Sequence, residues 1–284
     1  MKNIIVSAFA DEYSSDFDTQ LKMLADNGIK YIEPRFLYGK NVADLTKEEA
    51  NDAAKKLSAF GIGVSSIGSP LGKINLVDDF SEHLEKAKRV FEVSNILGTK
   101  NIRMFSFYLR EGESPDECRG EVIEKLGKMI DLAEGFGVTL CHENEAKIYG
   151  ESPERCFDIL EEFKGKLKAV FDMGNFVLDG YRPHPDAYEM LKEHIEYFHI
   201  KDALYKGAIV PPGLGEASIE EILAAHSEKS SKNFFITLEP HLETFDGLNA
   251  LVGKTFENPY KFANKEEAFL MAIEKLKMLI NEKY

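Results

Sequence analysis

The chain has 284 residues, of which 44% are hydrophobic, and this is enough apolar material for one large core. Its 49 acidic residues outnumber the 35 basic ones, and the formal net charge of -14 would repel the phosphate backbones of DNA and RNA. Composition and charge therefore argue against nucleic-acid partners.

The sequence also argues against secretion and membrane insertion. The apolar run that starts at Ile4 is interrupted by Asp11 and Glu12 before it could form the core of a signal peptide. Apolar residues never form the run of about eighteen that a membrane span needs. The three cysteines, an odd number without CxxC spacing, are typical of free thiols in a reducing compartment. We therefore expect a soluble cytoplasmic protein.

Eight short β-type runs alternate with amphipathic stretches along the chain. Their apolar residues are mostly consecutive, which is typical of parallel strands covered on both faces. In chain order the runs are IIVSAF from Ile4, YIEPRF from Tyr31, GVSSIG from Gly63, NIRMFSF from Asn101, VTLCHE from Val138, KAVFDM from Lys168, YFHIKD from Tyr197 and FFITLE from Phe234.

Helix starts and ends lie between these runs. Four positions have N-cap residues followed by proline or glutamate: Thr46 with Glu49, Ser114 with Pro115 and Glu117, Ser152 with Pro153, and Ser218 with Glu221. Glycines typical of helix ends are Gly28, Gly61, Gly98 and Gly137. A last helix is expected from Lys265 to Lys283. This repetition favours a closed (β/α)8 TIM barrel over an open doubly wound sheet, and we expect residues 1–284 to form one such domain.

The fifth to eighth predicted strands end in metal-ligating residue types: Glu143, Asp172, His199 and Glu239. The carboxyl ends of barrel strands converge on one mouth, so these residues predict a site for one divalent metal there. Three carboxylates and one imidazole favour a hard ion, with Mn²⁺ as the first choice and Mg²⁺, Co²⁺ or Zn²⁺ as alternatives. One such residue alone could instead hold a loop amide or pack in the core, but four in register favour a metal.

The segments CHENEA, FDMGNF, FHIKD and TLEPH carry these residues, and together they resemble the xylose isomerase-like barrel superfamily over essentially the whole chain. That superfamily includes sugar isomerases, ketose 3-epimerases, inosose dehydratase and the endonuclease-IV type of AP endonuclease. The resemblance implies the same four metal ligands and a proton-transfer role for Glu143 and Glu239. It also places Lys201 and Asp202 at the mouth, in contact with substrate or in a structural ion pair.

Two departures from the superfamily limit what the resemblance implies. Ketose 3-epimerases usually carry a histidine and a glutamate where this chain has Asn175 and Tyr149, so the substrate contacts differ and Asn175 is expected to make one of them. The AP endonucleases need further histidines for a three-metal cluster, and the third and fourth strands here offer Ser69, Phe105 and Phe107 instead. DNA repair is therefore disfavoured.

The resemblance implies a divalent-metal-dependent isomerase or epimerase of a ketose, keto-inositol or related sugar, acting through an enediolate. A lyase on the same scaffold, either an inosose-type dehydratase or an eliminative 3-keto-glycoside deglycosylase, stays open, as does a non-catalytic sugar-binding barrel. Asp11 and Glu33, at the first two strand ends, could contact substrate hydroxyls or seal the barrel. Neither His142 nor His241 is assigned a side of its strand. The partner expected is a small sugar or polyol, and residues 240–262 could form a lid or a homo-oligomer contact.

Overall fold

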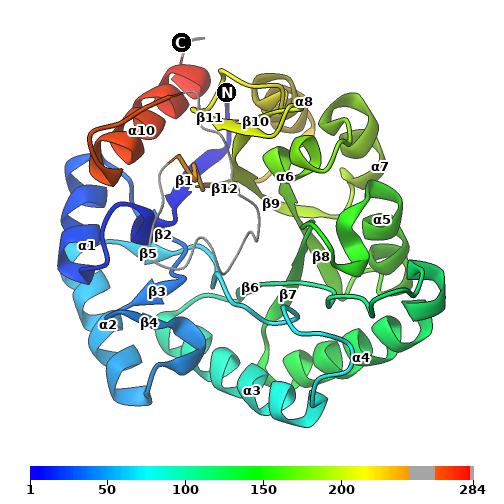
Figure 1. The fold of residues 1–284 in the computed structure, drawn as a ribbon. Coiled ribbons are helices and arrows are strands. Elements are labelled where there is room, and N and C mark those ends of the chain that lie inside the picture. Colours follow the sequence, from blue (N-terminus) through cyan, green and yellow to red (C-terminus); the bar gives the residue numbers. More distant parts are fainter. Residues whose placement is uncertain (243–259, 282–284) are drawn as a thin grey trace.

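The computed structural model describes residues 1–242 and 260–281, and in them the chain forms a (β/α)8 barrel with helices around a cylinder of parallel strands (Figure 1). Six strands pair in parallel in the order β1 (Ile4–Ala8), β12 (Phe234–Leu238), β9 (Ile195–Ile200), β8 (Leu167–Asp172), β7 (Thr139–Glu143) and β6 (Asn101–Met104). The remaining two, β2 (Tyr31–Ile32) and β5 (Gly63–Val64), pair with each other. A hydrogen bond from Glu33 N to Ala8 O and a bridge between Ile67 and Ile102 complete the ring.

Helices surround the strands on the outside of the barrel (Figure 1). They are α1 (Phe17–Asp26), α2 (Lys47–Phe60), α3 (Phe80–Leu97), α4 (Pro115–Phe136), α5 (Pro153–Glu162), α7 (Tyr188–Leu191), α8 (Ile219–Lys229) and α10 (Lys265–Asn281). The short helix α6 (Met173–Leu178) directly follows β8 and lies inside this ring (Figure 1). Two hairpins, β3 (Phe36–Leu37) with β4 (Lys40–Asn41) and β10 (Asp202–Leu204) with β11 (Ala208–Val210), lie outside the barrel sheet. Among the described residues, none of the helices has the length and apolarity that crossing a membrane requires.

The eight predicted strands are all present, but the second and third have only two residues each, and the fourth ends at Met104 instead of Phe107. β2 ends before Pro34, which has no N–H to give to a neighbouring strand. β5 ends before Ser66, whose hydroxyl donates to Asn101 O, while Thr99 Oγ1 donates to Ser65 O. Side-chain hydrogen bonds thus replace part of the strand ladder on this side of the barrel. Most of the predicted 240–262 segment lies outside the described residues.

Most predicted helix boundaries are confirmed. Thr46 and Ser114 form complete capping boxes, and Ser152 accepts a hydrogen bond from Arg155 N. Gly61, Gly98 and Gly137 each end a helix in the left-handed conformation. Ser218 differs, because α8 begins after it but its side chain makes no capping bond and its φ is 53°. The preceding loop is instead fixed by Asp202, whose Oδ1 accepts from Ala217 N.

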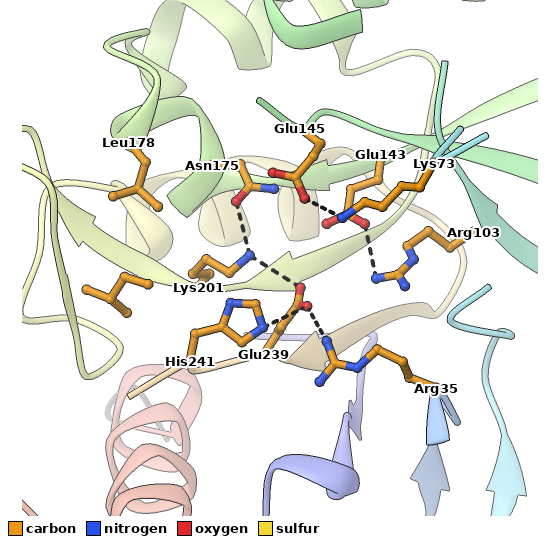
Figure 2. A pocket seen from close by; sticks show the side chains of 11 residues that line it. Arg35, Lys73, Arg103, Glu143, Glu145, Asn175, Leu178, Lys201, Glu239 and His241 are labelled. Atoms are coloured by element: carbon orange, nitrogen blue, oxygen red, sulfur yellow. Dashed lines mark hydrogen bonds and ion pairs between the residues drawn. The ribbon is translucent and has the colours of Figure 1, made fainter. Parts of the chain in front are cut away.

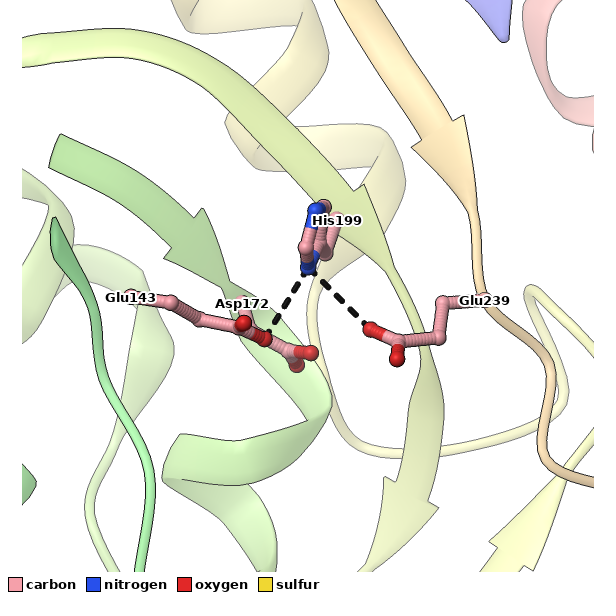
Figure 3. A group of neighbouring side chains, drawn as sticks. All are labelled: Glu143, Asp172, His199 and Glu239. Carbon is pink, nitrogen blue, oxygen red and sulfur yellow. Dashed lines mark hydrogen bonds and ion pairs between the residues drawn. The ribbon is translucent and has the colours of Figure 1, made fainter. Parts of the chain in front are cut away.

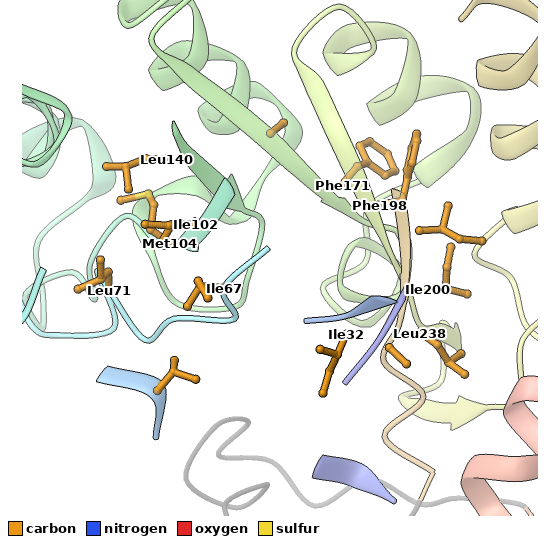
Figure 4. Packing of buried hydrophobic residues seen from close by; sticks show 14 of the residues in the cluster. Ile32, Ile67, Leu71, Ile102, Met104, Leu140, Phe171, Phe198, Ile200 and Leu238 are labelled. Atoms are coloured by element: carbon orange, nitrogen blue, oxygen red, sulfur yellow. The ribbon is translucent and has the colours of Figure 1, made fainter. Parts of the chain in front are cut away.

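Alternation along the strands separates two apolar layers. Leu140, Phe171 and Phe198 belong to the large cluster between sheet and helices, part of which Figure 4 shows. Their chain neighbours Cys141, Val170 and Tyr197 form a small separate cluster, which is expected inside the barrel because successive strand residues face opposite sides. The inward face is therefore set by residue parity, and this fixes where the strand-end side chains point.

Candidate metal centre

The four predicted ligands come together at the carboxyl ends of their strands. Glu143, Asp172 and His199 each lie two residues after a member of the small inward cluster, so they share its face. Glu239 directly follows β12, and its N–H donates to Ile200 O. All four are at most 2% exposed, and one ligand atom of each lies within 4.8 Å of the others (Figure 3). Strand register thus assembles three acids and a histidine from four strands.

His199 stands between the two glutamates. Its Nδ1 lies 2.9 Å from Glu143 Oε1 and 3.1 Å from Glu239 Oε2, as Figure 3 shows. Its Nε2 lies 3.3 Å from Glu33 Oε2 on the other side of the ring. Burial would lower the pKa of His199, but Glu143, Glu33 and Glu239 together raise it well above 6.5. With no metal bound, the imidazole therefore carries the positive charge that holds these carboxylates together.

The donor set fits a divalent cation. One nitrogen and three carboxylates are a ligand combination for Mn²⁺, Mg²⁺, Co²⁺ or Zn²⁺. Glu143 Oε2 and Glu239 Oε2 are buried and accept no hydrogen bond from any described residue, although cationic side chains lie nearby. Buried oxygens without donors are unfavourable, and a cation would satisfy them. Glu33 accepting from Nε2–H would leave Nδ1 as the coordinating nitrogen.

Asp172 is the most firmly held of the four. Its Oδ1 accepts from Asn175 N and caps α6, while its Oδ2 accepts from Lys201 Nζ at 2.9 Å. The side chain of Asn144 bonds both the N–H and the carbonyl of Asp172. Burial, together with the charges of Glu143 and Glu239, raises the pKa of Asp172 to about 7 against the opposing charge of Lys201. This carboxyl is therefore partly protonated near neutral pH before a cation binds.

A cleft opens over the cluster. Of the residues predicted to bind substrate, Lys201 and Asn175 line it, and Lys201 Nζ donates to Asn175 Oδ1 at 3.0 Å. Asp202 does not belong to its lining, because its carboxylate accepts four backbone N–H groups, from Ala203, Gly213, Gly215 and Ala217. Of the two roles considered for Asp202, the structural one is therefore favoured.

Asp11 and Glu33 lie next to the cleft but are not part of its lining. Glu33 is fully buried below His199 and accepts from Tyr197 OH at 2.9 Å and Thr237 Oγ1 at 2.7 Å. Asp11 Oδ2 accepts from Arg35 Nε at 2.9 Å. These positions favour sealing and orienting roles for both acids over direct contact with substrate.

Arg35 connects three acids from two segments of the barrel mouth, the 3-10 turn after β1 and the end of β12. Besides Asp11, it contacts Glu239 Oε1 at 3.0 Å and Glu12 Oε1 at 3.3 Å. Burial raises the pKa of Glu12 to about 8, although Arg35 opposes this. Glu12 and Glu239 also form a group with His241 whose atoms are close enough for a metal, but the Arg35 guanidinium already contacts both acids. We therefore assign no ion to that second group.

Several cleft residues were not predicted from the sequence: Arg35, Lys73, Arg103 and Glu145 (Figure 2). The two arginines could have been recognised from the sequence as candidate site residues, since each is a charged residue inside a predicted barrel strand. Lys73 and Glu145 lie in loops, and no sequence pattern distinguishes them from other surface charges. His241 also lines the cleft. His142 does not, because strand alternation turns it toward Ser106 Oγ, 3.0 Å away.

Comparison with known proteins places this geometry in a wider group. A family model described as a xylose isomerase-like TIM barrel matches residues 21–257. The IolI protein with a bound zinc atom is similar in structure, with a TM-score of 0.75 at 17% identity over 99% of both chains. The probable 3-DHS dehydratase AsbF from Bacillus anthracis gives 0.73 at 18% identity, covering 98% of this chain and 100% of that one. The 3-keto-D-glucoside 4-epimerase YcjR from E. coli gives 0.67 at 14% identity over 99% of both. No curated protein matches in sequence.

Proposed function

We propose that this chain, which belongs to the xylose isomerase-like TIM barrel family, is a divalent-metal-dependent isomerase or epimerase of a ketose, a keto-inositol or a related sugar. The observation that carries the proposal is the placement of Glu143 and Glu239. They face His199 Nδ1 at 2.9 and 3.1 Å from the ends of β7 and β12. Two buried carboxylates on different sides of one cleft suit the removal of a proton at one position and its return at another.

Glu143, Asp172, His199 and Glu239 would hold the ion, with Mn²⁺ preferred over Mg²⁺, Co²⁺ and Zn²⁺. When bound, such an ion supplies Lewis-acid polarisation of a carbonyl beside the carbon that loses its proton.

The two glutamates are ionised near neutral pH, as bases must be. Burial alone would raise both pKa values, but His199 and Arg103 lower the pKa of Glu143 to about 2. Lys201 and the neighbouring histidines hold the pKa of Glu239 well below 4.5. One glutamate removes the proton α to the carbonyl, and the other takes a proton from solvent and delivers it to the resulting enediolate. The first glutamate then releases its proton to solvent. Return to the opposite face of the same carbon gives epimerisation, and return to the adjacent carbon gives isomerisation.

Lys201 and Asn175 orient the substrate on one side of the cleft. The Lys201 ammonium has three donors, and its described hydrogen bonds to Asp172 and Asn175 use two of them. The third faces Glu239 Oε2 at a longer distance of 3.5 Å, and a substrate oxygen in the cleft that Lys201 lines could share it. Because Asp172 and Asn175 fix the ammonium, little side-chain entropy is lost when it binds.

A lyase is the second candidate, and Glu12 favours it. Burial raises the pKa of Glu12 to about 8, so this side chain is an acid at neutral pH. Its Oε1 lies 3.3 Å from His241 Nε2, and His241 lines the cleft. A proton passed from Glu12 through His241 could protonate a leaving hydroxyl or glycosidic oxygen. Isomerisation and epimerisation do not need this proton.

A metal-supplemented screen of ketoses, inososes and 3-keto-glycosides tests the proposal. We expect turnover of at least one of them with Mn²⁺ and little without it. Loss of water or of a glycosidic substituent would select the lyase. Saturable binding of a sugar with no turnover of any compound would select the sugar-binding barrel instead.

Solvent exchange in D₂O tests the two glutamates. With a substrate from the screen, the wild type should place deuterium at the carbon α to the carbonyl. Glu143→Gln and Glu239→Gln, each shown to hold metal, should lose net turnover by roughly 100-fold or more. Glu196→Gln, an exposed change on β9, is the control. Full activity in either metal-loaded variant would remove that glutamate from the mechanism.

A further inference from the structure

The two arginines of the cleft are satisfied to different degrees. Arg35 has an acidic partner at each of three nitrogens, with Asp11, Glu239 and Glu12 at 2.9 to 3.3 Å. Arg103, on β6, is only 3% exposed, yet its Nε has no hydrogen-bond partner among the described residues. Its Nη2 makes a long 3.4 Å bond to Ser69 O, and its Nη1 lies 3.2 Å from Glu143 Oε2.

The contact with Glu143 does not satisfy all the hydrogen-bond donors of Arg103. That carboxylate also faces His199 at 2.9 Å, so the arginine shares it with a second cation. A guanidinium has five N–H donors in a planar fork, and a buried donor without an acceptor is unfavourable because it has lost its hydrogen bonds to water. Arg103 lines the cleft, so a ligand there could supply the missing acceptor.

Lys73 adds a second positive charge next to Arg103. Its Nζ lies 4.3 Å from the centroid of the Phe105 ring, and Arg103 Cζ lies 5.0 Å from the same centroid. Lys73 pairs with Glu145 at 2.8 Å, which occupies one of its three donors. Both cations are on the side of the cleft opposite Lys201 and Asn175 (Figure 2). Each cation faces one carboxylate, Glu145 or Glu143, and an anionic ligand in the cleft would be attracted by both cations.

We infer that the substrate carries an anionic group, a carboxylate or a phosphate, which Arg103 and Lys73 bind. This inference rests on the proposed function and narrows its substrate class to acidic sugars, sugar phosphates and related keto acids. The Arg103 fork suits two oxygens of either group, and the Lys73 ammonium adds a point charge. Lys201 and Asn175 would then face the opposite end of the substrate. A neutral ketose would offer the Arg103 Nε only an uncharged hydroxyl or carbonyl oxygen, which accepts a weaker hydrogen bond from a guanidinium than an oxyanion does.

Matched ligand pairs test the inference without needing turnover. Calorimetry on Mg²⁺-loaded protein compares gluconate with glucitol for a carboxylate, and fructose 6-phosphate with fructose for a phosphate. At least one anionic member should bind tenfold or more tightly than its neutral partner. The pair that shows the preference identifies the anionic group.

Variants assign that preference to the two cations. Arg103→Met should abolish it, Arg103→Lys should retain part of it, and Lys73→Met should reduce it. Lys206→Met, which removes one exposed positive charge from the β10–β11 hairpin, is the control and should keep it. Circular dichroism and the Mg²⁺ affinity show that each variant is folded and loaded.

The outcomes separate this inference from the proposed function. Equal binding within both pairs, or a preference that survives in the double variant Arg103→Met/Lys73→Met, would overturn the anionic subsite. An anion preference without turnover of any ketose would support the subsite and count against the isomerase. Turnover of neutral ketoses without an anion preference would support the isomerase and count against the anionic subsite.

Discussion

Replacing Glu33 by glutamine should weaken metal binding although Glu33 is not among the four proposed ligands. The Glu33 carboxylate lies 3.3 Å from His199 Nε2 and is fully buried. By accepting the Nε2 proton, it keeps the Nδ1 lone pair directed at the other acids. A hydrogen bond to a charged acceptor contributes about 1.5–3 kcal/mol. We therefore expect Glu33→Gln to raise the metal dissociation constant roughly 10- to 100-fold, the range typical of residues that orient ligands.

The glutamine should fit without leaving a polar atom unpaired. Its carbonyl oxygen can accept from Thr237 and His199, as Oε2 does now. Its amide can donate to the Tyr197 hydroxyl, because that hydroxyl can in turn donate to Ser66 Oγ at 2.8 Å. The substitution thus removes the charge and keeps the shape, so the fold should survive.

Isothermal titration of the metal-free protein with Mn²⁺ measures the effect, and Glu196→Gln on the exposed face of the same strand as His199 is the control. Glu33 also raises the pKa of His199, so its removal weakens the binding of the competing proton to His199 as well as the binding of the metal. The loss of affinity should therefore be larger at pH 9 than at pH 7. A folded Glu33→Gln protein with unchanged affinity at both pH values would refute the reasoning.

Three further predictions follow from the buried charges and from one backbone position. Metal affinity should rise with pH, roughly 10- to 100-fold per pH unit between pH 6 and 7. The reason is that the ion must displace protons from His199, whose pKa is raised, and from Asp172, with a pKa of about 7. Calorimetric titration in buffers of different ionisation enthalpy counts the released protons, and an affinity that does not change with pH would contradict the prediction. Glu12 has its pKa raised by burial from 4.5 to about 8, so between these values the folded chain binds more protons than the unfolded one and loses stability as pH rises. Glu12→Gln should therefore gain roughly 1–3 kcal/mol relative to wild type between pH 5 and pH 9 in urea unfolding, and an equal difference at both pH values would rule this out. Gly72→Ala should lower stability by roughly 3 kcal/mol or more, because its Cβ would lie 1.9 Å from a backbone oxygen. Gly98→Ala is the control: Gly98 is also in the left-handed region but in open space, so this variant should lose only about 1 kcal/mol. Similar melting temperatures for the two variants would show that the backbone shifts to accommodate the new Cβ.

The barrel and its four strand ends with acidic or imidazole side chains could be predicted from local sequence patterns. Buried parallel strands require consecutive apolar residues, and helix caps require particular residue types, so both leave local patterns that can be read without a structure. The capping boxes at Thr46 and Ser114 formed as predicted for this reason. Strand ends that converge on one mouth follow from the fold class alone.

The residues that support the cluster from neighbouring elements could not be predicted from these patterns. Glu33 and Asp11 look alike in sequence, yet one lies under His199 and the other holds Arg35. Lys73 approaches Arg103 because both contact Phe105, although thirty residues of chain separate them. These relations depend on the side chains' directions and on the close approach of distant loops. Sequence periodicity reports burial along one element, whereas the partner of a buried charge is chosen by packing between elements.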